Sequence, residues 1–175
     1  MARPDPTEAG TDQATRGGVV SCGVVILNPA RELFACRATG RGRWDLPKGL
    51  AEPGEAPRAT AVREAAEEAA LCIEPALLCD LGVFDYLPQK RLHLFGLRVG
   101  PDAFDIAECR CRSTFVDMRS GRLLPEVDDY AWKPVNNLDG WCGKNLARVL
   151  GALDWARIAR LREIGRVPLA AGQSE

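Results

Sequence analysis

An α+β or α/β fold, in which helices flank a mostly mixed β-sheet, is what this 175-residue sequence predicts. Runs rich in β-branched residues are followed by segments with helical periodicity, which is typical of a sheet covered by helices. A hydrophobic fraction of 46% is ordinary for a globular protein with a core of its own. The length suits one domain, and no internal repeat divides it.

The sheet is expected to contain six main strands. Runs of β-branched and aromatic residues predict them, and Pro, Gly and Asn mark the turns between them. The expected strands are residues 18–27, 32–38, 76–87, 90–99, 112–118 and 129–135. Residues 44–47 are expected to form a short extended segment, and residues 49–57 a loop.

Three helices are expected around this sheet, over residues 57–71, 140–153 and 154–165. Pro57 is compatible with a first helical turn, although Ala56 lacks the side-chain oxygen of a good N-cap. In the last helix, four apolar side chains are spaced for one buried face, which indicates core packing. These are Trp155, Ile158, Leu161 and Ile164.

One folded domain is expected over residues 18–165, followed by a flexible C-terminal tail at 166–175. Residues 1–17 are polar, rich in Pro, Gly and Thr, and lack periodicity, so they are expected to be disordered. They also lack the apolar segment of a signal peptide. Apolar runs such as 23–27 are too short to cross a bilayer. A cytoplasmic protein without a membrane partner is therefore expected.

Charge and cysteine usage argue against several classes of function. The 23 basic and 24 acidic residues nearly cancel, so no overall basic field favours nucleic acid as a partner. The seven cysteines contain no Cys-x-x-Cys pair, and His93 is the single histidine. Reduced and mostly buried thiols are therefore expected rather than disulfides or a zinc site. His93 alternates with leucines, which favours a structural role.

Glu64, Glu67 and Glu68 stand close together on the expected helix 57–71. At about 100° per residue they fall within one arc, while small apolar residues occupy the opposite side. Glu64 and Glu68 form a like-charge i,i+4 pair, which costs a few tenths of a kcal/mol in an isolated helix. Two interpretations remain open, a solvated acidic face or a site for a hard divalent cation beside a glycine-containing loop.

The spacing Gly49-x5-Glu55-x7-Arg63-Glu64-Ala-Ala-Glu67-Glu68-Ala-Ala70-Leu resembles the signature of the Nudix hydrolase family, G-x5-E-x7-R-E-U-x-E-E-x-G-U, in which U is aliphatic. All six anchors up to Glu68 match, whereas Ala70 replaces the last glycine. Residues 43–49, "RWDLPKG", resemble the W-x-x-P-K-G lead-in of family members that act on dinucleoside polyphosphates. Residues 125–138 resemble a later family segment, so the resemblance covers about 18–141.

This MutT-like resemblance implies a Nudix-type α/β/α sandwich and the metal-dependent hydrolysis of a diphosphate linkage in a nucleoside diphosphate joined to another group. The lead-in favours dinucleoside polyphosphates as substrates. Nucleoside triphosphate pyrophosphatase activity, sugar-nucleotide hydrolysis and removal of pyrophosphate from an RNA 5′ end remain open. A Nudix module that senses a nucleotide without cleaving it also remains open, because Ala70 departs from the signature. Homodimers are frequent in the family.

The resemblance also implies roles for individual residues. Glu64, Glu67 and Glu68 are expected to hold Mg²⁺ or Mn²⁺, with the carbonyl of Lys48 or Gly49 as a backbone ligand. Glu64 is the candidate general base, and Glu55 and Arg63 are expected to form a supporting ion pair. Glu126 is the candidate for a further metal-binding acid outside the signature. Its competitors are Asp128, Asp129 and, less favoured, Glu108.

Basic and aromatic residues near the signature are candidates for binding the substrate. Arginine and lysine side chains bind phosphates, and aromatic rings stack on a base. The candidates are Arg37, Arg43, Trp44, Lys48, Tyr86, Lys90 and Arg91, with Arg41 as a further nearby cation. The alternative is that at least half of the cations are solvated and that the aromatic residues belong to the core or its rim.

Overall fold

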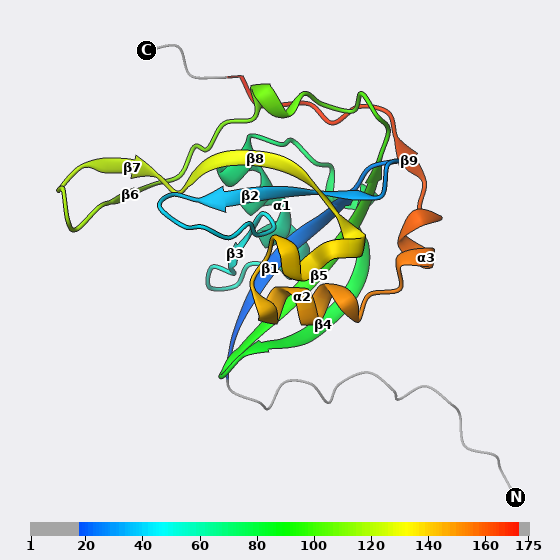
Figure 1. Ribbon diagram of the computed structural model, residues 1–175, viewed down its shortest axis with the longest axis horizontal. Coiled ribbons are helices and arrows are strands. Elements are labelled where there is room, and N and C mark those ends of the chain that lie inside the picture. Colours follow the sequence, from blue (N-terminus) through cyan, green and yellow to red (C-terminus); the bar gives the residue numbers. More distant parts are fainter. Residues whose placement is uncertain (1–17, 172–175) are drawn as a thin grey trace, which may run out of the picture.

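The computed structural model describes residues 18–171, so the expected disordered segment 1–17 lies outside the described residues (Figure 1). The main sheet of the protein has seven strands. These are β1 Val19–Leu27, β2 Glu32–Ala38, β3 Lys48–Leu50, β4 Cys79–Leu87, β5 Lys90–Val99, β8 Val127–Pro134 and β9 Glu163–Ile164. A separate hairpin consists of β6 Thr114–Val116 and β7 Leu123–Pro125. The α-helices are α1 Pro57–Ala69, α2 Lys144–Gly151 and α3 Trp155–Ala159. Short 3₁₀ helices are η1 Pro75–Leu77, η2 Ile106–Glu108 and η3 Val135–Gly140.

β1 is the central strand of the main sheet, whose order is β4-β5-β1-β2-β8. It runs parallel to β5 along its whole length, from the pair Val19–Lys90 to the pair Leu27–Arg98. On its other side β1 pairs with β3 near its start and meets β2 near its end, at Leu27–Leu33, in both cases antiparallel. The sheet is therefore mixed, as predicted.

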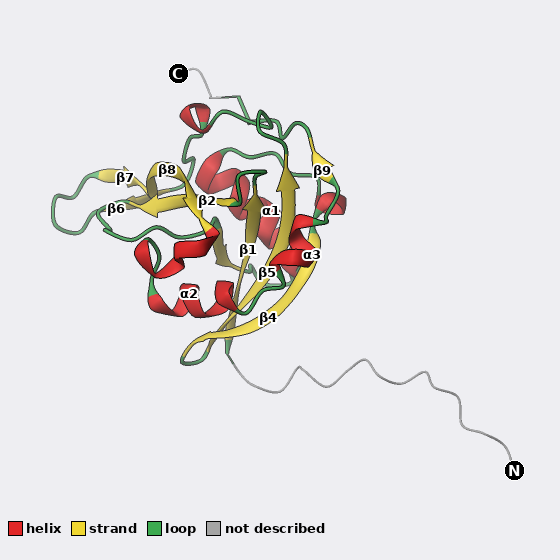
Figure 2. Cartoon of the chain, turned by 45° about the vertical axis from the view of Figure 1, so that its right-hand side comes forward, coloured by secondary structure: helices red, strands yellow, loops and turns green. Residues whose placement is uncertain are grey.

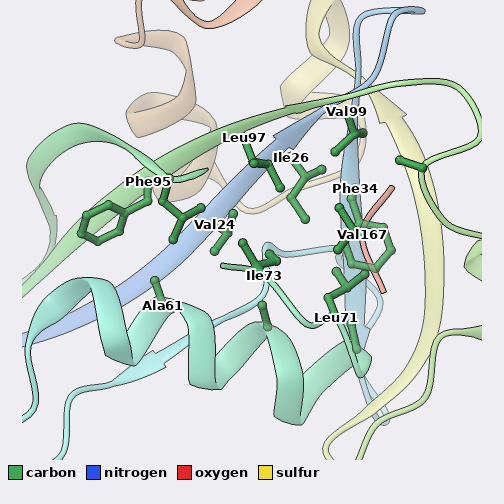
Figure 3. Packing of buried hydrophobic residues seen from close by; sticks show 14 of the residues in the cluster. Val24, Ile26, Phe34, Ala61, Leu71, Ile73, Phe95, Leu97, Val99 and Val167 are labelled. Atoms are coloured by element: carbon green, nitrogen blue, oxygen red, sulfur yellow. The ribbon is translucent and has the colours of Figure 1, made fainter. Parts of the chain in front are cut away.

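Helices cover both faces of this sheet (Figure 2). Along β1, Val24 and Ile26 point into a cluster that includes Ala61 and Ala65 of α1, and Figure 3 shows part of this cluster. Val25, which lies between them, points into a second cluster with residues of α2 and α3. This alternation follows from the period of two in a strand, and the resulting α/β/α sandwich confirms the predicted fold class.

Several predicted boundaries are wrong because tertiary pairing decides them. The expected helix 154–165 ends at Ala159, and Glu163–Ile164 pair in parallel with β5 instead. Leu161 and Ile164 consequently pack against different clusters, so the four apolar residues do not share one helix face. Strands β3 and β7 were not predicted, since their short sequences lack a β-branched pattern of their own.

Other elements match more closely. The bounds of β2 and β5 agree with the prediction, while the expected helix 57–71 ends at Ala69 and the expected helix 140–153 starts at Lys144. Part of the expected C-terminal tail packs on the domain: Val167 is buried, and its N–H donates to the carbonyl of Ala103 (2.9 Å). No helix within residues 18–171 is long and apolar enough to cross a membrane.

Ala70 terminates α1 in the left-handed conformation, with φ 58° and ψ 17°. Its N–H donates to the carbonyl of Ala66 (3.0 Å), as in a helix cap of the left-handed type. Glycine is the usual residue there, because a Cβ in this conformation costs roughly 1–2 kcal/mol. The substitution in the family signature therefore leaves the helix end intact and places conformational strain on it.

We expect Ala70→Gly to raise the free energy of unfolding by about 1 kcal/mol, because relief of the positive φ exceeds the loss of one buried methyl group. Urea denaturation of both proteins measures the difference. Ala66→Gly, in the interior of α1, is the control and should lower stability by about 1 kcal/mol. Unfolding of Ala70→Gly at a lower urea concentration than the wild type would contradict the strain argument.

Candidate active site

Glu64 lies on the buried side of α1, with a relative exposure of 8%. Gly49 of β3 faces it so closely that a Cβ on Gly49 would overlap the Glu64 carboxylate. Desolvation in this position raises the pKa of Glu64, which the Arg63 guanidinium opposes and the charges of Glu67 and Glu126 reinforce. The first glycine of the signature is therefore needed for space, since only a residue without a side chain admits this carboxylate.

Arg63 connects the carboxylates of the signature to one another. Its Nε and Nη2 donate to the two oxygens of Glu55 at 2.9 and 3.0 Å. Its Nη1 donates to Glu64 Oε1 at 2.8 Å and to Glu67 Oε2 at 3.0 Å. A further bond from Nη2 reaches the carbonyl of Leu50 (2.9 Å). The structure thus contains the expected Glu55–Arg63 pair, and the same guanidinium offsets repulsion on the helix.

Glu68 points toward the start of β3. Its Oε2 accepts the backbone N–H of Lys48 at 3.1 Å and lies 3.8 Å from the Sγ of Cys36. Burial raises the pKa of Glu68 to about 8, although the N–H and the charge of Lys48 lower it. A cation bound near Glu68 would favour the ionised form of this carboxylate.

The donor set fits a hard divalent cation in its chemistry. Such ions prefer several carboxylate oxygens. Glu64 is a buried carboxylate in a cradle that a Cβ on Gly49 would fill, and Glu68 is a half-buried carboxylate beside Lys48. Within residues 18–171, no three acidic, His or Cys side chains already stand at metal-ligand spacing. Arg63 holds Glu64 and Glu67, and the Lys48 N–H holds Glu68, so ligand binding requires their side chains to turn.

Glu126 lies exposed at the junction between β7 and β8. Its N–H donates to the carbonyl of Ser113 (3.1 Å), its own carbonyl accepts from Thr39 (2.9 Å), and its charge raises the pKa of Glu64. The competing acids Asp128 and Asp129 both pair with Arg37, at 3.2 and 3.1 Å. This pairing favours Glu126 over the two aspartates.

Glu108, the fourth candidate acid, lies on η2 and lines a different cavity, beside residues 165–169.

Lys48, Tyr86 and Lys90 gather at a polar cluster on the other face of β3. Lys48 Nζ lies 2.9 Å from Asp45 Oδ2 and 5.8 Å from the centre of the Tyr86 ring. Burial raises the pKa of Tyr86. Burial and the charge of Lys48 lower the pKa of Lys90, against the opposite effect of Asp45. Sequence reasoning missed Asp45, although it stands within the "RWDLPKG" segment.

The other predicted substrate-binding residues do not form one group. Two cations lie near the Trp44 ring, with Lys133 Nζ 4.1 Å and the Arg37 guanidinium carbon 5.4 Å from the ring centre. Arg43 instead donates to the backbone carbonyls of Asp139 and Cys142, which is a structural role.

Arg91 and His93 belong to β5. Arg91 Nε is buried without a hydrogen-bond partner among the described residues. His93 bonds to the Asp80 carboxylate (2.9 Å) and stacks on Phe95, which fits the structural role expected for it.

Tyr130 is a second residue that sequence reasoning missed. Its hydroxyl donates to the carbonyl of Glu68 (2.6 Å), while the N–H of Arg112 donates to the carbonyl of Glu67 (2.6 Å). These contacts satisfy carbonyl groups that would otherwise be unpaired at the end of α1. Tyr130 stands within the 125–138 segment, but nothing in its local sequence indicates the distant contact.

Comparison with known proteins agrees with this arrangement. A family model described as the NUDIX domain matches residues 18–149. A 17.7 kDa protein of Enterobacteria phage T4, encoded in the e-segB intergenic region, is 33% identical over 143 residues, which span 77% of this chain and 94% of that protein.

Two solved structures share the fold. A MutT NUDIX hydrolase from Burkholderia pseudomallei has a TM-score of 0.54 at 20% identity, covering 76% of this chain and 95% of that one. The NUDIX domain of NrtR from Shewanella oneidensis, in complex with ADP-ribose, also has a TM-score of 0.54, at 13% identity, with 85% and 90% covered. The mixed sheet, the glutamate-bearing helix α1 and the match to the family model together identify a Nudix domain. The chain belongs to the Nudix family and is a Nudix hydrolase.

The Glu55–Arg63 pair predicts a specific loss of stability in acid. Hydrogen bonds from Arg63 and from the backbone N–H of Glu52 lower the pKa of Glu55 from 4.5 to about 2. This stabilisation is present above pH 4.5 and is lost as the pH falls toward 2. We expect Glu55→Gln to be less stable than the wild type at pH 7, with the difference shrinking as the pH falls toward 2.

Urea unfolding in buffer with a chelator, at several pH values from 7 downward, measures this difference. Glu52→Gln is the control, because it removes a neighbouring exposed carboxylate that makes no ion pair among the described residues. A constant difference between wild type and Glu55→Gln across this pH range would refute the assignment.

Proposed function

We propose that the chain hydrolyses a diphosphate linkage in a nucleoside diphosphate joined to another group, with Mg²⁺ or Mn²⁺ as the cofactor. The observation that carries this proposal is the carboxylate platform of α1, in which Glu64 is buried against Gly49 and linked through Arg63 to Glu67. Membership of the Nudix family supports it, because the family generally uses divalent metals.

Glu64, Glu67 and Glu68 would hold the cation, with the Gly49 carbonyl and Glu126 as further ligands. A cation bound there would neutralise the diphosphate and lower the pKa of an attacking water. Arg63 keeps Glu64 and Glu67 close together before the ligand arrives. Glu64 is the candidate base, because it is the buried carboxylate of this group and lies against Gly49.

Dinucleoside polyphosphates are the substrate class that we favour. Lys48 and Lys90 lie near each other on the face of β3 opposite Glu68, where they can bind phosphates that are not cleaved. Trp44 and Tyr86 supply aromatic rings for a base. Nucleoside triphosphates are the alternative substrates, because they offer the same phosphate chemistry. The assay below distinguishes the two substrate classes. The departure at Ala70 was the reason to consider a module that senses a nucleotide without cleaving it. Because Ala70 preserves the end of α1, this departure does not favour that alternative.

Glu67→Gln should lower the rate of diphosphate hydrolysis by at least about 100-fold, because it removes one carboxylate from the proposed metal site. Release of phosphate and mononucleotide is measured with Mg²⁺ or Mn²⁺ over dinucleoside polyphosphates, nucleoside triphosphates, ADP-ribose and sugar nucleotides. Glu74→Gln, an exposed carboxylate just before η1, should retain full activity. Unchanged turnover in Glu67→Gln would sink the proposal.

Gly49→Ala should displace Glu64 while the fold is retained, because the new Cβ meets the end of a flexible side chain rather than the backbone. We expect at least a tenfold loss of kcat/KM and weaker Mn²⁺ binding by calorimetry, with little change in Tm. Gly143→Ala is the matched control, since its Cβ would enter open space. Wild-type Mn²⁺ affinity in Gly49→Ala would show that Glu64 is not a ligand.

A further inference from the structure

The β6–β7 hairpin, residues 114–125, is a two-stranded ribbon that projects from the body of the domain in both drawings (Figures 1 and 2). Its apolar side chains are unusually exposed: Met118 by 92%, Leu123 by 66%, Val116 by 56% and Phe115 by 37%. None of them belongs to either core cluster of the described chain. An isolated two-stranded hairpin is marginal in water, so this ribbon has the character of a surface that a partner covers.

The ribbon is also basic. Arg119 and Arg122 are exposed, and neither of them forms an ion pair within residues 18–171. Asp117 is the single acid of the hairpin, and its carboxylate is engaged by the N–H and hydroxyl of Ser120. The combination of Met, Phe and Arg is typical of protein interfaces.

A cavity of about 400 Å³ elsewhere on the same chain has the complementary chemistry. It lies between the η2 region and residues 165–169, and its lining is mostly polar, with Phe104, Pro168 and Leu169 among its apolar members. Asp102, Asp105 and Glu108 also line it, against one cation, Arg166. Asp102 and Glu108 are exposed and form no ion pair among the described residues, so their charges are available to a basic partner.

We propose that the β6–β7 ribbon of one copy of this chain docks into the cavity beside η2 of a second copy. Met118 at the tip covers Phe104, Pro168 and Leu169, and Arg119 and Arg122 face Asp102 and Glu108. Because each copy carries both surfaces, two copies can exchange ribbons reciprocally around a two-fold axis, which closes the assembly. This association concerns no residue of the proposed metal site, so its test is independent of catalysis.

A second copy fits the ribbon better than a nucleic acid does. Single-stranded nucleic acid is bound by aromatic rings that stack on bases within a basic groove. The ribbon offers only one aromatic residue, Phe115, and its most exposed side chains are the aliphatic Met118, Leu123 and Val116. The acidic cavity supplies the matching charge on the chain itself.

Sedimentation velocity of the full chain over about 1–200 µM tests the proposal, with light scattering for the mass of the assembly. The wild type should associate, and Met118→Glu should raise the dissociation constant by at least about tenfold, because its carboxylate would face the acidic cavity. Met118 is almost fully exposed in one copy, so this substitution leaves the fold unchanged. Circular dichroism and thermal melts verify that every variant is folded.

Charge reversal tests the pairing of the two surfaces directly. The double variants Arg119→Glu with Arg122→Glu, and Asp102→Arg with Glu108→Arg, should each be monomeric alone. Mixed one to one, they should form a heterodimer, because each reversed surface then meets its complement. The control reverses two exposed arginines that belong to neither surface, at positions 160 and 162, and should still associate.

A wild type that stays monomeric throughout this range overturns the proposal. So does an assembly that survives both double reversals, or a mixture of the two that remains monomeric. A monomer whose ribbon arginines instead bind single-stranded RNA, measured by fluorescence anisotropy with an oligonucleotide, overturns it as well. Loss of catalysis in Glu67→Gln has no bearing on any of these outcomes.

Discussion

Repulsion among the carboxylates of α1 is the constraint on which the rest of the site depends. Glu64, Glu67 and Glu68 lie within little more than one helical turn, and such like-charge neighbours destabilise a helix. Arg63 supplies the counter-charge, and because it also bonds Glu55 and the Leu50 carbonyl, it fixes the loop between β3 and α1 as well. One guanidinium therefore contributes to helix stability, to loop conformation and to carboxylate geometry.

The sheet provides the close approach that this network needs. β1 changes partner along its length, from β3 near its start to β2 near its end, which lets β3 turn toward α1. Ala61, Ala65 and Ala69 are fully buried, and their small side chains allow the helix to pack tightly on the sheet. Gly49 then faces Glu64 without a side chain between them. The metal-binding chemistry proposed here is thus a consequence of small residues on both elements.

Sequence reasoning succeeded where the signal was local and failed where a distant contact decided the outcome. The alternating apolar runs of β2 and β5 predicted their bounds, and the spacing of the glutamates placed them together on α1. By contrast, β9 exists only through pairing with β5, and Tyr130 reaches Glu68 from another strand. The left-handed Ala70 could not be predicted either, because nothing in its neighbours requires a positive φ.

Lys48 connects the groups on the two faces of β3. Its backbone N–H binds Glu68 on one side, whereas its side chain extends to Asp45 and Tyr86 on the other. β1 approaches β3 closely at Gly23, where a Cβ would lie 2.6 Å from that of Lys48. A larger residue at Gly23 would push β3 away from β1, whereas a larger residue at Gly49 would displace the Glu64 carboxylate. A shift of β3 would also move the Lys48 N–H away from Glu68, and with it the ammonium group of Lys48, because both belong to the same residue of this three-residue strand.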